Sequence, residues 1–378
     1  MKLFKSLLIA PATLGLLSPL SALSSEVDFQ AISNYSKSDI ELDANSFKHS
    51  PTNNTLLSGG EGLVESVSSD SFSSTTSASF TAEAILGGIS TDLEAAEGAD
   101  VEAVSLDYQY GIGLTSSFTG EDSLDVTIDV GGGSNGGSQT SIYMGMDATD
   151  DAMVVDGITY TFPVGGTTML VGDSTDISAL YTGACAYSGF IDYSTNCGTG
   201  NSLGVGGQGV TAAMSYAFDS GFSLAGGVSS PAGEILGNAN DSFGIEAAYS
   251  ADDYGVAIAF SDIEGDTDST YTGLNGFYSF DFATISAGYE TNDVDEADDT
   301  SSFFVGLTKE IGPGTAEVGY TSTDMDPYEF GITETAYLYE ASYSFPVNDA
   351  LTITPGVGIL DIEAGETTIA AVKATFSF

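Results

Sequence analysis

Residues 367–378 read TTIAAVKATFSF, a stretch in which apolar and polar side chains alternate with a period of two residues. One face of this stretch collects Thr368, Ala370, Val372, Ala374, Phe376 and Phe378, and the other collects Ile369, Ala371, Lys373, Thr375 and Ser377. Successive side chains of a strand point to opposite faces, so the first face is apolar and aromatic-tipped while the second is mixed and largely polar. This arrangement suits a strand that meets lipid on one side and water on the other.

The same alternation recurs upstream from about residue 77. Three of the apolar faces are Val104, Leu106, Tyr108, Tyr110 and Ile112, then Leu124, Val126, Ile128 and Val130, then Phe243, Ile245, Ala247 and Tyr249. Short turns alternate with long loops, and aromatic residues gather at the short-turn ends, which is the outer-membrane pattern. We therefore predict an all-β fold, a transmembrane antiparallel β-barrel of about sixteen strands over residues 77–378. The alternative is a β-sandwich, which rarely needs so many strands in one domain.

Closure of the predicted sheet would satisfy its backbone in lipid. Every N–H and C=O group in hydrocarbon must be paired, and only a closed sheet leaves no edge. Side chains no longer fill the interior of a barrel of about sixteen strands, so we expect a water-filled channel.

The N-terminus carries the features of a secretory signal peptide, predicted over residues 1–24. Lys2 and Lys5 precede an apolar run at 7–17, and 22–24 form a small-x-small cleavage site. The alternative to a signal peptide is a helical membrane anchor, but the apolar run is too short to span a bilayer as a helix. Residues 25–76 alternate weakly and are expected to form an irregular periplasmic lead-in segment, or else one extra helix or strand at the barrel mouth.

The charge is strongly one-sided, with 54 acidic residues against six Lys and no Arg. No Lys lies between Lys48 and Lys309. Such a chain has nothing to neutralise phosphate, so nucleic acid is excluded as a partner. Two interpretations stay open together: adaptation to a salty medium and a surface or pore that attracts cations.

Acidic residues on the polar faces are the candidate pore-lining groups. They are Glu83, Asp107, Asp125, Asp129, Glu246, Glu317 and Glu340, with Lys373 as the lone cation assigned inward. Carboxylates in a narrow aqueous pore raise the local cation concentration and repel anions, which predicts a cation preference. The plainer interpretation is that polar residues face water in any barrel.

Two cysteines, Cys185 and Cys197, predict one local disulfide in an oxidising compartment. A loop this short gains about 3 kcal/mol from the bond in the chain-entropy picture. A zinc site is not expected, because the only histidine, His49, is far away in the sequence. The same histidine is the only candidate base for a hydrolase and lies outside the predicted barrel, so we expect no enzyme.

Several blocks resemble the cyanobacterial outer-membrane porin family. They are the leader MKLF, LLIAPA and LGLL of residues 1–17, GGEG at 59–62, SFSSTT at 71–76, SSFTGED at 116–122 and YTFPVG at 160–165. The resemblance implies an outer-membrane channel for ions and small hydrophilic solutes, related to carbohydrate-selective porins, with a homotrimer as a plausible assembly. Two departures stand out. Residues 25–76 lack the S-layer-homology motif of many relatives, and the third strand carries Asp125 and Asp129 where relatives often place Arg or Lys.

General porins fold the loop after the fifth strand inward, and residues 174–207 occupy that place here. Asp173, Asp176 and Asp192 lie in or next to it together with the cysteine pair. We expect a constriction loop stiffened by the disulfide; the alternative is a stapled surface loop.

The resulting hypothesis is a diffusion porin of the outer membrane. Its expected partners are membrane lipid, small solutes and the assembly machinery, for which Phe376 and Phe378 form the terminal signal. A carbohydrate-selective porin is the alternative within transport, and an acidic structural or adhesive surface protein is the alternative outside it. No cofactor is expected beyond loosely bound Ca²⁺ or Mg²⁺ in acidic loops such as 262–268 and 293–299.

Overall fold

A computed structural model describes residues 75–92, 104–132, 138, 140, 143–147, 149–204, 209–231, 235, 241–265, 268–295, 299–324, 335–363 and 365–378. The predicted signal peptide and residues 25–74 of the lead-in segment lie outside the described residues, so these boundaries stay predictions.

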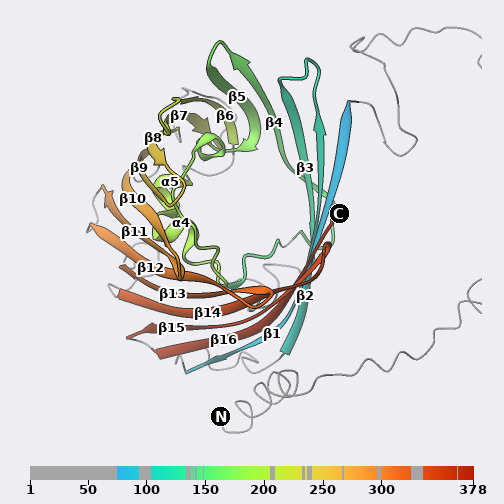
Figure 1. The fold of residues 1–378 in the computed structure, drawn as a ribbon, viewed down its shortest axis with the longest axis vertical. Coiled ribbons are helices and arrows are strands. Elements are labelled where there is room, and N and C mark those ends of the chain that lie inside the picture. The colour runs from blue at the N-terminus through green and yellow to red at the C-terminus, as the bar shows by residue number, and fades with distance from the viewer. Residues whose placement is uncertain are drawn as a thin grey trace, which may run out of the picture. The chain divides into compact units, whose positions relative to one another are not determined.

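Sixteen antiparallel strands form a closed barrel in which each strand pairs with its neighbours in sequence and β1 pairs with β16 (Figure 1). The strands are β1 Thr76–Thr91, β2 Val104–Ser116, β3 Ser123–Gly131, β4 Val154–Val164, β5 Thr167–Thr175, β6 Gly209–Ala217, β7 Phe222–Ser230, β8 Ser242–Ser250, β9 Tyr254–Ile263, β10 Ser269–Phe280, β11 Ala283–Val294, β12 Thr300–Ile311, β13 Gly314–Asp324, β14 Thr335–Asn348, β15 Leu351–Ile362 and β16 Gly365–Ser377. The predicted fold class is confirmed. None of the helices in the described ranges has the length and apolarity to cross a bilayer.

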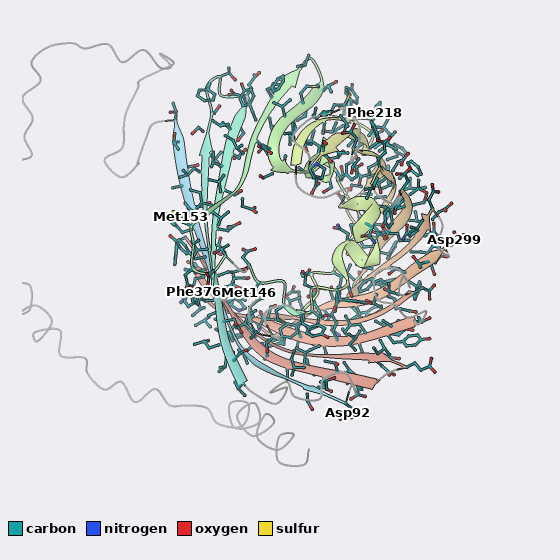
Figure 2. The ribbon with its side chains drawn as sticks, turned by 180° about the vertical axis from the view of Figure 1, so that it is seen from behind. Asp92, Met146, Met153, Phe218, Asp299 and Phe376 are labelled. Atoms are coloured by element: carbon teal, nitrogen blue, oxygen red, sulfur yellow. A yellow bond between two sulfur atoms is a disulfide. The ribbon has the colours of Figure 1, made fainter. Side chains whose placement is uncertain are left out.

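The two faces of each strand differ as the alternation predicts. On β16, Val372 is 40% exposed on the outer face, whereas Ile369 on the inner face is fully buried. Large apolar side chains are exposed on the outer face around the barrel, including Leu106, Ile245 and Phe218, the last of which is labelled in Figure 2. An outer surface this apolar is stable only against lipid or another apolar surface.

Short turns join the strands at one end of the barrel. They are the connections 117–122, 165–166, 218–221, 251–253, 281–282, 312–313 and 349–350. The strands that flank the longest connections, 132–153 and 176–208, meet those connections at the opposite end. Aromatic rings line the short-turn end of β7 to β11, where centroids of neighbouring rings from Phe222 to Phe282 are 4.6 to 6.3 Å apart. Rings at this level match the interfacial girdle of a membrane barrel.

The β2–β3 turn is organised around the carboxylate of Asp122. Its Oδ1 accepts hydrogen bonds from the backbone N–H of Phe118 at 2.9 Å and of Thr119 at 2.8 Å. The hydroxyl of Ser117 donates to the same oxygen, and that of Tyr160 donates to Oδ2 at 2.7 Å. These bonds, that from Thr119 above all, hold the pKa of Asp122 well below its usual range.

Candidate functional site

The β5–β6 connection folds into the barrel, and its residues 176–204 are here named the constriction loop. It contains the 3₁₀ helix η2 (Ile177–Leu180) and the short helices α4 (Thr195–Gly198) and α5 (Gly200–Leu203). Figure 1 shows α4 and α5 on the inner side of the wall near β9 to β12. The loop begins where Asp176 caps η2, since its carboxylate accepts the backbone N–H of Ser178 at 2.7 Å.

In the first half of the constriction loop, before α4, backbone N–H groups donate to side chains of the barrel wall. Thr182 and Gly183 donate to the two oxygens of Glu246 on β8, each at 2.7 Å. Ala184 donates to Asn275 Oδ1 on β10 at 3.1 Å, and Ala186 donates to Ser286 Oγ on β11 at 3.2 Å. A loop without regular structure leaves its N–H groups unpaired, and these acceptors satisfy them in turn.

Two further glutamates of the wall accept hydrogen bonds from the same half of the loop. Glu317 Oε1 on β13 accepts the N–H of Ser188 at 3.1 Å. Glu340 Oε2 on β14 accepts the N–H groups of Phe190 at 3.0 Å and Ile191 at 2.8 Å. The Tyr187 hydroxyl donates to Glu340 Oε1 at 3.0 Å. Burial, and then the Glu340 carboxylate, raise the pKa of Tyr187, so its hydroxyl stays protonated and able to donate.

The second half of the loop, which contains α4 and α5, is hydrogen-bonded to β11 and joined to the first half by a disulfide. Glu290 accepts the N–H and hydroxyl of Ser202 on Oε2, at 2.7 and 2.6 Å, and the amide of Asn201 on Oε1 at 3.0 Å. A disulfide joins Cys185 to Cys197, with 5.7 Å between their Cα atoms. The predicted disulfide is thereby confirmed, and it links the two halves of the constriction loop.

Glycines on the inner face of the wall make room for the loop. A Cβ added at Gly288 would lie 2.0 Å from the carbonyl oxygen of Cys197, and one at Gly273 would lie 2.0 Å from Ser202 Oγ. Gly306, Gly319 and Gly356 likewise lie against Tyr187 or Phe190. A side chain at these positions would push the loop off the wall.

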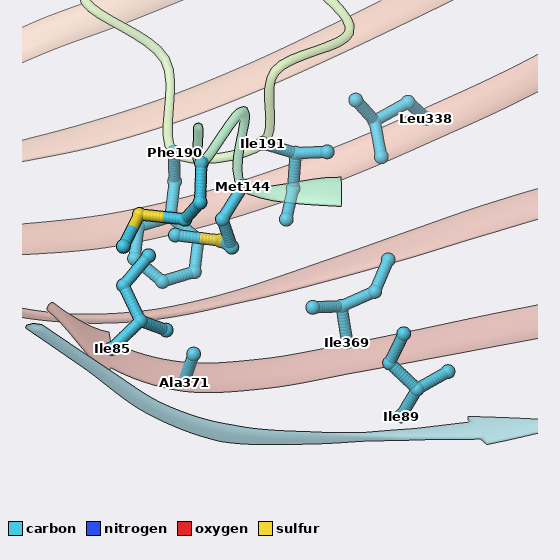
Figure 3. Packing of buried hydrophobic residues seen from close by; sticks show 9 residues of the cluster. Ile85, Ile89, Met144, Phe190, Ile191, Leu338, Ile369 and Ala371 are labelled. Atoms are coloured by element: carbon cyan, nitrogen blue, oxygen red, sulfur yellow. The ribbon is translucent and has the colours of Figure 1, made fainter. Parts of the chain in front are cut away.

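A second inward segment, Tyr143 to Asp147 of the β3–β4 connection, meets the constriction loop. Its Tyr143 carbonyl accepts the N–H of Asp192 at 2.9 Å. An apolar cluster forms there inside the barrel (Figure 3). It joins Met144, Met146, Phe190 and Ile191 from the two segments to Ile85, Ile89, Leu338, Ile369 and Ala371 of β1, β14 and β16. Burial of this cluster fixes both segments on one part of the wall.

The wall formed by β1 to β3 carries acidic side chains on its inner face. Asp107 accepts the hydroxyl of Ser138 at 2.6 Å, and Asp125 accepts that of Thr115 at 2.6 Å. Glu83 accepts Gln109 Nε2 at 2.8 Å and lies 3.8 Å from Lys373 Nζ.

Asp129 on β3 and Asp147 on the inward segment add to this acidic wall. Partial burial, and then the charges of Asp156 and Glu83, raise the pKa of Asp147. This repulsion reflects the closeness of several carboxylates in one part of the lumen.

The predicted site residues divide into three groups. Glu83, Asp107, Asp125, Asp129 and Lys373 lie on inner faces of β1, β2, β3 and β16. Glu246, Glu317 and Glu340 also face inward, but their exposed fractions are 0, 5 and 4%, because the constriction loop covers them. They anchor the loop, which differs from the open pore lining expected from alternation alone.

The third group consists of the three aspartates assigned to the constriction loop. Asp176 and Asp192 lie in the loop, the first as a helix cap and the second exposed. Asp173 instead lies in β5, because this strand extends to Thr175. It is two residues after Val171 and therefore lies on the same outer face. The pattern-based interpretation missed Asn275, Ser286, Glu290 and Tyr187, although the first three occupy inward positions of their strands.

Among the residues that the structure describes, no group of three or more His, Cys, Asp or Glu side chains is arranged to hold a metal ion. The suggested Ca²⁺ or Mg²⁺ loops at 262–268 and 293–299 lie partly outside those residues.

No protein-family model and no curated protein sequence matches this chain. Solved structures match its fold. A loop-deletion mutant of OmpT, an outer membrane protein of Vibrio cholerae, superposes with a TM-score of 0.58 at 12% identity over 80% of this chain and 100% of that one. The anion-selective porin of Comamonas acidovorans gives 0.55 at 14% identity, over 80 and 99%. Pseudomonas putida OprB gives 0.60 at 10% identity, over 80 and 94%. These similarities show a porin-like barrel fold.

Proposed function

We propose that the chain is an outer-membrane porin, a water-filled channel through which ions and small hydrophilic solutes diffuse passively. The observation that carries this proposal is a closed sixteen-strand barrel, apolar outside, with a long loop pinned against its inner wall. A closed sheet pairs all of its ladder groups and can cross lipid. The porin-like fold favours a channel over an enzyme.

We further propose that the channel prefers cations. Glu83, Asp125 and Asp129 face the lumen from the wall that the constriction loop leaves uncovered, whereas Asp107 on the same wall is only 9% exposed. Lys373 is the inward-facing Lys of the described strands, whereas Lys309 lies on the outer-face register of β12 with Phe303 and Val305. An acidic constriction concentrates cations and excludes anions.

The finer assignments remain proposals. The kinship with cyanobacterial porins and the homotrimer rest on the sequence resemblance, and recognition of Phe376 and Phe378 by the assembly machinery rests on the aromatic outer face of β16. Phe378 does complete the seam of the barrel, where it exchanges two backbone hydrogen bonds with Phe80 at 2.9 and 3.0 Å. Carbohydrate selectivity is the alternative to a general diffusion pore.

Reconstitution tests the channel directly. The refolded protein, checked for a heat-modifiable band on a gel, should insert into planar bilayers with stepwise conductance increments in KCl. A folded barrel that conducts no ions would overturn the porin proposal.

The cation preference is tested on the same bilayers with Asp125→Asn/Asp129→Asn. This variant should lower the K⁺/Cl⁻ permeability ratio, while Asp173→Asn, which removes one charge from the outer face, should not. An unchanged ratio in the double variant would contradict the acidic-lumen explanation.

A further inference from the structure

Two buried oxygen atoms in β7 and next to β8, at the end of the barrel opposite the short turns, have no hydrogen-bond partner in the described part of the chain. They are Ser230 Oγ, in a fully buried residue, and Asp241 Oδ1, in a residue that is 3% exposed. An unpaired buried oxygen costs free energy, and buried charges in proteins are paired with a cation or coordinate a metal ion. The two atoms therefore point to a ligand at this place in the wall.

Ser230 and Asp241 are neighbours across the β7–β8 ladder. Ser229 pairs with Ser242 in that ladder, so the next position sets Ser230 opposite Asp241. On the other side, the backbone N–H of Glu264 donates to the carbonyl oxygen of Asp241 at 2.8 Å. Directly opposite residues of an antiparallel pair share a face, and their Cβ atoms are about 4.5 to 5.5 Å apart. Ser230, Asp241 and Glu264 therefore form a row across β7, β8 and β9, which are consecutive in the barrel wall (Figure 1).

The row lies on the outer face, at the edge of the apolar band. Asp241 is two residues before Phe243, which is 36% exposed on that face. Along β9, Glu264 is ten residues after Tyr254 of the aromatic girdle. That length is about 34 Å along the strand and, at a tilt of about 40°, about 26 Å along the barrel axis, close to the height of the apolar band. A hydrated ion can thus reach the row from the external medium without crossing lipid.

The electrostatic surroundings of the row favour a cation. The Lys residues of the described ranges are Lys309, near the short-turn end of β12, and Lys373, on the inner face of β16. Neither strand is adjacent to β8. Asp262 shares the outer face of β9 with Glu264 and adds a further negative charge. Within the described residues, no cationic side chain neutralises the row, so a metal ion is the counter-charge that fits it.

The donor set suits Ca²⁺. This ion takes six to eight oxygen ligands in flexible geometry and accepts water among them, whereas Mg²⁺ demands a near-ideal octahedron and dehydrates reluctantly. Two carboxylates and one hydroxyl leave much of the coordination shell to water. We therefore expect weak binding, with a dissociation constant of about 0.1 to 1 mM, as in extracellular calcium modules.

We propose that Ser230, Asp241 and Glu264 bind a Ca²⁺ ion that links β7, β8 and β9 at the external edge of the barrel. Ser230 Oγ and Asp241 Oδ1 supply the two oxygens that the fold leaves unpaired, and the Glu264 carboxylate supplies a second charge. The site belongs to the outer surface of the wall, so it does not depend on whether the lumen conducts.

Equilibrium dialysis of radiolabelled Ca²⁺ against the refolded full chain in detergent micelles measures the site. KCl at about 0.15 M suppresses diffuse binding to the acidic surface. Wild type should bind one Ca²⁺ per chain more than Asp241→Asn, and Ser230→Ala should weaken that site at least about threefold. Asp252→Asn removes the same charge from the turn at the other end of the β8–β9 hairpin and should bind like wild type. Equal Ca²⁺ binding by wild type and Asp241→Asn would overturn the proposal.

Heat stability of the same proteins adds a change of sign that the loss of an ordinary contact would not produce. In EDTA, Asp241→Asn should be at least as stable as wild type, because it removes an unpaired buried charge. At about 10 mM Ca²⁺, the heat-modification temperature of wild type and of Asp252→Asn should rise, while that of Asp241→Asn should stay unchanged. Mg²⁺ at the same concentration should raise it less.

Ser230→Ala keeps the charge and gives the same comparison if Asp241→Asn does not refold; its Ca²⁺-induced rise should be smaller than that of wild type. A heat-modification temperature that Ca²⁺ leaves unchanged in wild type, or raises equally in wild type and in Ser230→Ala or Asp241→Asn, would refute the site. An ordered water would then be the partner of the two oxygens.

Discussion

Replacing Glu340 by alanine should release the constriction loop from the barrel wall. Its carboxylate accepts the N–H groups of Phe190 and Ile191 and the hydroxyl of Tyr187, at 2.8 to 3.0 Å. Phe190 and Ile191 are each 4% exposed, so their N–H groups have little access to water. Glu340 is thus the most heavily used acceptor between the loop and β14.

The size of the effect follows from the donors left behind. An unsatisfied buried N–H costs about 1 to 3 kcal/mol, so two of them destabilise the docked loop by about 4 kcal/mol. A change of this size shifts the ratio of docked to undocked loop by about a thousandfold. Glu340→Gln keeps one acceptor oxygen for the two N–H groups and should cost about 1 kcal/mol.

Single-channel recording measures the consequence, because an undocked loop alters the cross-section of the pore. Glu340→Ala should show increased open-channel noise and additional conductance levels, and Glu340→Gln should be close to wild type. Glu310→Ala is the matched control, since Glu310 is exposed and accepts one hydroxyl, that of Thr315 at 2.9 Å.

The reasoning fails if Glu340→Ala gives the conductance and noise of the Glu310→Ala control while the barrel stays heat-modifiable on a gel. In that case other contacts of the loop hold it without Glu340.

Three other perturbations have defined outcomes. Cys185→Ser/Cys197→Ser, or a reductant on the wild type, removes a constraint worth about 3 kcal/mol in the chain-entropy picture and should increase open-channel noise in bilayers. Gly288→Val places a side chain against the Cys197 carbonyl and should displace the loop, which a changed single-channel conductance would reveal. The pKa of Asp122 is lower in the folded state than in the unfolded chain, where it is about 4. Its contribution to stability is therefore fully present above about pH 4 and is lost progressively as the pH falls toward the folded-state pKa. The difference in heat-modification temperature between wild type and Asp122→Asn should therefore shrink below about pH 4.

Each of these predictions has its own control and a result that would contradict it. Reductant should leave the Cys185→Ser/Cys197→Ser variant unaffected, and noise that rises equally in both would point to another cause. Gly113→Val adds a side chain to the inner face of β2, beside Ser79 and away from the loop, and a conductance change equal to that of Gly288→Val would count against displacement. A constant gap between wild type and Asp122→Asn from pH 7 to pH 3 would show that the ionised carboxylate does not stabilise the turn.

The barrel could be predicted because lipid and water impose opposite demands on alternate residues of every strand. Val372 outside and Thr375 inside β16 follow that rule, whereas Ile369 is an inward apolar residue that the two inward segments bury. The period-2 pattern says which way a side chain points but not what covers it. Glu246 and Glu340 therefore satisfied the same criterion as Asp125, although the loop buries only the first two.

A second signal was present in the sequence. Gly273, Gly288, Gly306 and Gly319 all occupy inward positions on consecutive strands β10 to β13. Inward positions of a wide polar lumen have no need of glycine unless a backbone or ring approaches closely. A row of inward glycines marks the track on which the constriction loop lies.

The reversal potential of the wild-type channel in a planar bilayer under a KCl gradient tests the central claim most directly. The acidic wall of β1 to β3 predicts a sign that corresponds to K⁺ permeating faster than Cl⁻, with the preference weakening at high salt as the carboxylates are screened. A reversal potential of the opposite sign would contradict the account of this lumen.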